Sequence, residues 1–184
     1  VQLGQVGRWY IVSALGLTAL GYLIMTGYDH LGAHYVGHRL GVRQVTFTSL
    51  LGYAFSNSLG GPLGAGTVRL RIYSGWGLSG GKIVSLILFT TSSVFLGLVV
   101  LAGFVLLLSP IPANMDLPLL SGSMLPLGLV LLFLAALYVV VCGKCRRVIT
   151  IYGWSFQLPS GKLACGQLLV GSLEWLVAAL VFYV

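Results

Sequence analysis

Four long stretches of this chain are continuous, apolar and almost free of charge; they cover residues 9–28, 82–108, 124–141 and 163–184. About 20 apolar residues are enough for a helix to cross the hydrocarbon core of a membrane. In lipid every backbone N–H and C=O needs a partner within the protein, so only helices and closed barrels span the membrane. The stretches do not alternate as barrel strands do. We therefore predict an all-α, polytopic transmembrane helical bundle.

The charge balance agrees with a membrane protein. Only 7% of residues are charged and 58% are hydrophobic, whereas a soluble domain carries about 25% charged residues. The net charge of +7 arises because 10 Lys and Arg face only three acids, which are Asp29, Asp116 and Glu174. Basic residues at the ends of membrane helices set their orientation. We expect anionic phospholipids, and not nucleic acid, to be their partners.

The chain begins at Val1 and ends at Val184 inside an apolar stretch. We therefore expect residues 1–184 to be a single membrane domain and a fragment of a longer protein, with its oligomeric state open, a homo-oligomer included. Cys142 and Cys145 have the spacing of a metal-binding pair, but two further ligands are missing from their vicinity. We expect neither a metal site nor a cofactor.

Residues 45–76 are apolar but do not form a comfortable span. Polar residues interrupt the first limb, and the glycine-rich stretch 60–66 breaks any helix. We predict a re-entrant helical hairpin over 45–76, preceded by a short interfacial helix over 30–44. With four full spans and this hairpin, nine of the 10 basic residues lie on one side of the membrane and Arg8 lies opposite. The positive-inside rule places the basic loops in the cytoplasm.

Glu174 is the one charged residue in the apolar stretch 166–184. At 1.5 Å per helical residue, its Cα lies roughly 18 Å from Lys162, near the middle of the membrane. A carboxylate at this depth costs at least about 2.5–3.5 kcal/mol, and such residues commonly mark substrate or proton pathways. Glu174 is therefore the first candidate for a functional residue.

Asp29, Arg69 and Arg71 are the other charges nearest to the predicted membrane core. An arginine suits the oxygens of a phosphate and a carboxylate suits an ammonium group, so the set would complement a zwitterionic or cationic phospholipid headgroup. Broken helices also build many transporter sites. Candidates within the hairpin are Ser56, Asn57, Gly60, Gly61, Gly64 and Tyr73.

Other functions fit the same residues. Glu174 could serve as the proton site of a proton- or ion-coupled transporter of a small solute. The domain could also be a scaffold that anchors a partner enzyme, in which case its charges would be dispensable. The glycine-rich segment could serve helix packing alone. The chain lacks the motifs of soluble enzymes, and we do not expect it to perform covalent catalysis.

An ordered set of short motifs resembles the membrane region of the lysylphosphatidylglycerol synthetase/flippase proteins, the multiple peptide resistance factor family, and of the related YbhN-type membrane proteins. The set consists of Tyr28-Asp29, Gly52-Tyr53-Ala54-Phe55-Ser56-Asn57, Gly60, Val68-Arg69-Leu70-Arg71-Ile72-Tyr73, Gly77-Leu78-Ser79 and Glu174-Trp175. The resemblance covers the chain from about residue 20 to its end.

The resemblance implies a flippase domain of the bacterial inner membrane. It would move lysyl-phosphatidylglycerol from the inner to the outer leaflet, which protects the cell against cationic antimicrobial peptides. The functional charges of the family match Asp29, Arg69 or Arg71, and Glu174. A full-length parent of this kind would be a phosphatidylglycerol lysyltransferase with a synthase domain in the same chain. The aminoacyltransferase activity would not reside in these residues.

Overall fold

The computed structural model describes residues 7–37, 40–59, 62–108, 124–145, 148–151 and 154–183. Within these ranges the chain is mainly helical, as predicted, and one small sheet is added. The elements are α1 (Arg8–Tyr35), α2 (Val42–Leu59), α3 (Pro62–Gly75), α4 (Gly80–Leu108), α5 (Leu125–Lys144), β1 (Val148–Ile151), β2 (Trp154–Gln157) and α6 (Gly161–Tyr183).

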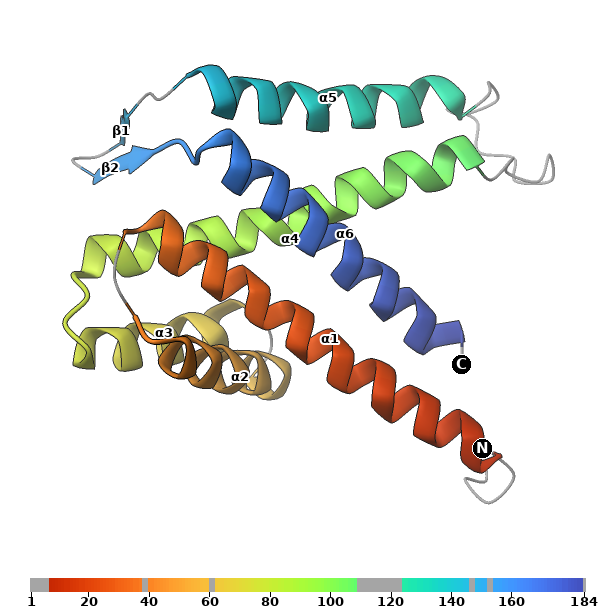
Figure 1. The fold of residues 1–184 in the computed structure, drawn as a ribbon, viewed down its shortest axis with the longest axis horizontal. Coiled ribbons are helices and arrows are strands. Elements are labelled where there is room, and N and C mark those ends of the chain that lie inside the picture. Colours follow the sequence, from red (N-terminus) through yellow and green to blue (C-terminus); the bar gives the residue numbers. More distant parts are fainter. Residues whose placement is uncertain are drawn as a thin grey trace.

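Four of the described helices, α1, α4, α5 and α6, are long and apolar enough to cross a membrane. They correspond to the four stretches predicted from the sequence. Helix α6 packs against both α4 and α1, while α5 packs mainly against α4. Figure 1 shows that α1 and α6 extend to the same end of the molecule, where α1 begins and α6 ends.

Helices α2 and α3 pack against each other as a hairpin. The start of α2 and the end of α3 lie at the end of the molecule where α1 ends and α4 begins (Figure 1). Exposed large apolar side chains lie mainly on α2, where they include Phe47 and Phe55, and α3 contributes Leu70. Two helical limbs agree with the sequence, but α3 already begins at Pro62, so the helix break predicted over 60–66 is wrong for residues 62–66. Entry of this hairpin into the membrane stays a prediction.

The boundary after the first span differs from the prediction. Helix α1 does not end near Asp29 but continues to Tyr35, and α2 begins at Val42. The separate interfacial helix predicted over 30–44 is therefore wrong. The physical reason is that Asp29 is neutralised by a partner from another helix, so α1 can continue through a charged position that looked like a span end.

The backbones of helices α4 and α6 almost touch at the point where the two helices cross. A Cβ atom added to Gly97 would lie 2.1 Å from the carbonyl carbon of Gly171, and one added to Gly171 would lie 2.5 Å from the carbonyl oxygen of Ser93. Small residues commonly allow membrane helices to approach in this way. Near the crossing, the indole Nε1 of Trp175 donates a hydrogen bond of 2.9 Å to the carbonyl of Val94. The α4–α6 pair therefore depends on the absence of side chains at two glycines.

A buried amide links three of the spanning helices. The Nε2 group of Gln167 on α6 donates hydrogen bonds to Ser93 Oγ at 2.9 Å and to the carbonyl of Phe89 at 3.2 Å, and it lies 3.3 Å from Ser92 Oγ. Its Oε1 accepts a hydrogen bond of 2.6 Å from the Tyr138 hydroxyl on α5. Gln167 is fully buried, so these bonds replace water that the membrane interior does not supply.

We expect Gln167→Leu to reduce the free energy of unfolding by about 1–3 kcal/mol, because it leaves the Tyr138 hydroxyl without its acceptor in an apolar interior. The thermal midpoint of the purified protein in detergent measures this. The double variant Gln167→Leu with Tyr138→Phe should recover part of the loss, since no orphaned hydroxyl remains. An unchanged midpoint in the single variant would show that the amide does not hold the helices together.

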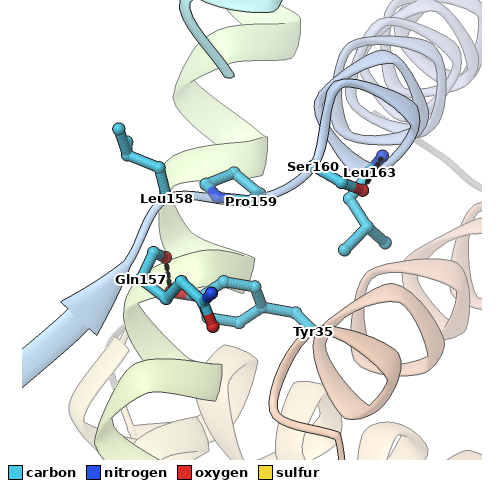
Figure 2. A pocket seen from close by; sticks show the side chains of 6 residues that line it. All are labelled: Tyr35, Gln157, Leu158, Pro159, Ser160 and Leu163. Carbon is cyan, nitrogen blue, oxygen red and sulfur yellow. Dashed lines mark hydrogen bonds between the residues drawn. The ribbon is translucent and has the colours of Figure 1, made fainter. Parts of the chain in front are cut away.

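The segment between α5 and α6, predicted as a basic and aromatic connector, contains the antiparallel pair β1–β2 with Val148 opposite Gln157. The Tyr35 hydroxyl of α1 donates a hydrogen bond to the carbonyl of Gln157, as Figure 2 shows. The Tyr35 ring also stacks on Phe89 of α4, with the ring centroids 4.8 Å apart. Beside this contact lies a shallow cavity of about 190 Å³ that reaches Ser160. These contacts fix the end of α1 against β2 and α4.

Candidate functional site

The centre of the site is a buried ion pair between α1 and α3. The Nε and Nη2 groups of Arg69 donate hydrogen bonds to Oδ1 and Oδ2 of Asp29, at 2.8 and 2.7 Å. Asp29 is fully buried and Arg69 is 4% exposed. The two parallel hydrogen bonds are the bidentate geometry in which arginine binds a carboxylate most strongly. Each charge is therefore neutralised by the other inside the protein.

Helix α2 completes this centre. The Ser49 hydroxyl donates a hydrogen bond of 2.7 Å to Oδ2 of Asp29. The guanidinium carbon of Arg69 lies 4.8 Å from the centroid of the Tyr53 ring, which is within the range of a cation–π interaction. Asp29 thus accepts three hydrogen bonds from two helices, and Arg69 is held from two sides. The pair ties α1 to both limbs of the hairpin.

The surroundings keep Arg69 charged and Tyr53 neutral. Burial alone would lower the pKa of Arg69, but the adjacent Asp29 carboxylate more than offsets this and the pKa is raised. Burial raises the pKa of the Tyr53 hydroxyl, and the negative charge of Asp29 raises it further. The centre therefore consists of a stable ion pair against a neutral phenol.

Glu174 lies on the other side of α1, at the contact between α1 and α6. Its Oε2 accepts a hydrogen bond of 3.4 Å from the hydroxyl of Tyr28, a fully buried residue. Tyr28 and Asp29 are consecutive on α1, yet Tyr28 contacts α6 and Asp29 contacts α2 and α3. One turn of α1 thus connects the two acidic groups of the site.

A groove of about 200 Å³ adjoins Glu174 between α1 and α6. Its walls are mainly apolar and it runs toward the end of the molecule where α1 begins and α6 ends; the lining residues are Leu17, Thr18, Gly21, Tyr22, Met25, Glu174, Val177, Ala178, Val181 and Phe182. Glu174 is the one carboxylate among them. The arrangement places an acid at the inner end of an apolar, laterally open groove.

The structure brings some predicted site residues together and leaves others apart. Asp29 and Arg69 are in contact, while Arg71 is exposed on α3. Gly64 is buried within α3, and Tyr73 belongs to an apolar cluster with Leu78, Ile83 and Leu86. Ser56 is half-buried on α2. Gly60, Gly61 and the side chain of Asn57 lie outside the described part of the chain.

Three residues of the site were not predicted as such. Tyr28 and Tyr53 were noted only as parts of motifs, and Ser49 was one of the polar residues that interrupt the first limb of the hairpin. A signal for Ser49 existed, because a hydroxyl in a membrane segment needs a hydrogen-bond partner. Which partner it takes depends on the packing of α2 against α1, and the spacing along the chain does not give this.

No protein-family model matches the chain. Among curated proteins, it is 33% identical over 177 residues to the inner membrane protein YbhN of Escherichia coli (strain K12), an alignment that covers 96% of this chain and 56% of YbhN. Over nearly its whole length the chain is thus similar to an inner membrane protein of the YbhN type. It is also 29% identical over 177 residues to the uncharacterized protein slr0712 of Synechocystis sp. (strain ATCC 27184 / PCC 6803 / Kazusa), with 95% of this chain and 54% of slr0712 covered.

The chain spans about half the length of these curated relatives. Similarity to an inner membrane protein and the four long apolar helices together support a membrane location. The YbhN part of the resemblance is thereby supported. The names of the two relatives mention neither a lipid nor lysyl transfer, so the multiple peptide resistance factor part and the orientation of the loops stay predictions.

Proposed function

We propose that this chain is a membrane transport domain that moves a phospholipid with a cationic headgroup between the leaflets. One observation carries the proposal: a half-buried carboxylate, Glu174, lies deep in the spanning helix α6, at the inner end of an apolar groove. Measured along the axis of α6, Glu174 lies roughly 20 Å from the first residue of the helix, close to mid-membrane. A carboxylate is retained at such depth at a cost, and it commonly marks a pathway.

The lining of the groove favours a lipid as the ligand. Leu17, Met25, Val181 and Phe182 would accommodate an acyl chain, while Glu174 would bind the positive group of the head. A ligand that is apolar along most of its length and cationic at one end fits both parts. Lysyl-phosphatidylglycerol is the substrate that we propose, in line with the resemblance of the motifs, and moving it would make the outer leaflet less negative.

The roles of the arginines follow from their different surroundings. Arg69 is held by Asp29, so this pair can contact a headgroup only after it separates. Arg71 lies on the same helix and is exposed, which leaves it able to meet a lipid phosphate at the basic end of the bundle. In this proposal Arg71 attracts the phosphate, Glu174 binds the ammonium group, and the Asp29–Arg69 pair holds the hairpin against α1.

We expect Glu174→Gln to lower transport of lysyl-phosphatidylglycerol to the outer leaflet at least tenfold, because glutamine keeps the shape but loses the charge that the ammonium group requires. The measurement is the outer-leaflet fraction of this lipid in cells that carry the full-length parent protein. Glu174→Asp, which retains the charge on a shorter side chain, should keep part of the activity. Unchanged outer-leaflet levels at equal protein abundance would remove Glu174 from the mechanism.

The small volume of the groove favours a second candidate, a proton-coupled transporter of a small solute with Glu174 as its proton site. The two candidates differ in their dependence on lipid. Transport that depends on pH, but not on the identity of the lipids in reconstituted vesicles, would favour the small solute. Transport of the labelled lipid itself, with selectivity for a cationic head, would favour the flippase.

A further inference from the structure

The Tyr28 hydroxyl is a hydrogen-bond donor to the Glu174 carboxylate, and its surroundings are closely packed. Tyr28 is fully buried. Its neighbour Gly27 lies so close to α6 that an added Cβ would be 3.3 Å from Val170 Cγ1. The spacing of α1 and α6 is therefore fixed by direct contact at this turn. The aromatic ring is enclosed between the helices, and the hydroxyl lies 3.4 Å from Oε2 of Glu174.

The next residue of α1 fixes the rotation of the helix. Asp29 is held by three hydrogen bonds from Arg69 and Ser49. Because Tyr28 and Asp29 belong to the same helical turn, anchoring Asp29 against α2 and α3 also sets the direction in which Tyr28 meets α6. The position of the hydroxyl thus depends on the ion pair on the opposite side of α1.

We propose that Tyr28 is a positioning residue that holds one carboxylate oxygen of Glu174 against α1 and presents the other to a cation in the groove. This inference rests on the proposed binding of a cationic headgroup by Glu174. A carboxylate on a flexible side chain has several rotamers, and a fixed donor selects one of them. Tyr28 therefore acts through Glu174 and need not touch the lipid.

The variant Tyr28→Phe removes the hydroxyl and keeps the ring that packs between the helices. We expect the half-saturating amount of lysyl-phosphatidylglycerol, measured with the full-length protein in vesicles of phosphatidylethanolamine and phosphatidylglycerol, to rise roughly threefold to tenfold. The maximal rate should change less, because Glu174 keeps its charge. Tyr10→Phe is the matched control, since Tyr10 lies on the same helix and is 59% exposed.

A second measurement does not depend on transport. Carbodiimides react with carboxyl groups in apolar surroundings, and peptide mass spectrometry gives the extent of modification at Glu174. We expect lysyl-phosphatidylglycerol to protect Glu174 in the wild-type protein and in Tyr10→Phe, and to protect it several-fold less in Tyr28→Phe. A residue that served packing alone would leave this protection unchanged.

The outcomes separate the two proposals. If Glu174→Gln transports the lipid normally, the proposed function fails whatever Tyr28→Phe does. If Glu174→Gln is inactive while Tyr28→Phe shows wild-type saturation and wild-type protection, the function stands and the role of Tyr28 is wrong. If Glu174→Gln is inactive, and Tyr28→Phe shows both a higher half-saturating amount of lipid and weaker protection of Glu174, both the proposed function and the role of Tyr28 are supported.

Discussion

Arg69→Leu should destabilise the protein by about 3–5 kcal/mol, because it leaves the carboxylate of Asp29 buried without a counter-charge. Asp29 is fully buried and receives two of its three hydrogen bonds from Arg69. Breaking a buried pair costs far more than the pair contributes when intact, since one charge remains in a medium of low polarity. The expected result is a large drop in the thermal midpoint in detergent and a lower abundance in membranes.

Two further variants show whether the unpaired charge of Asp29 causes this loss of stability. Arg71→Leu removes the same charge from the same helix at an exposed position and should change stability by less than about 0.5 kcal/mol. The double variant Asp29→Asn with Arg69→Leu should recover a good part of the loss, because no buried charge remains. If Arg69→Leu and Arg71→Leu have equal effects, the ion pair is not what holds the hairpin to α1.

Gly171→Ala should cost about 1–3 kcal/mol although it adds a single methyl group, because there is no room for a Cβ at the α4–α6 crossing. The added atom would lie 2.5 Å from the Ser93 carbonyl oxygen and 2.7 Å from Gly97 Cα. Both are backbone atoms, which cannot turn aside as a side chain does. The two helices must separate, and the Gln167 and Trp175 hydrogen bonds between them lengthen.

Gly16→Ala provides the control for this change. Gly16 lies within the exposed part of α1, and an added Cβ would meet nothing within 4 Å. Alanine favours the helix over glycine by about 1 kcal/mol, so this variant should be neutral or slightly stabilising. The comparison is the difference in thermal midpoint between the two variants in the same detergent. A Gly171→Ala protein as stable as Gly16→Ala would show that the helices cross with more space than the structure gives.

The candidate site could be predicted in part. Glu174 stood out because a charge in an apolar stretch is costly in lipid, whatever its neighbours are. Asp29 and Arg69 were identified as charges near the core, but both were assigned to a ligand. Their direct pairing was not foreseen, since 40 positions separate them in the chain. The hydroxyls of Ser49 and Tyr28 were missed for the same reason.

The amino-acid sequence by itself indicated the membrane location, the four long helices and the two shorter helices between the first two of them. These features follow from local properties: the length of apolar runs, the cost of an unpaired backbone group in lipid, and the effect of glycine and proline on a helix. The tertiary structure decided that α1 continues past Asp29, that Arg69 neutralises this acid, and that Glu174 faces Tyr28 and an apolar groove. Those outcomes depend on which faces of the helices meet. Residues that are far apart in the chain interact only when helix packing brings them within a few ångströms of each other, and no local sequence pattern specifies that packing.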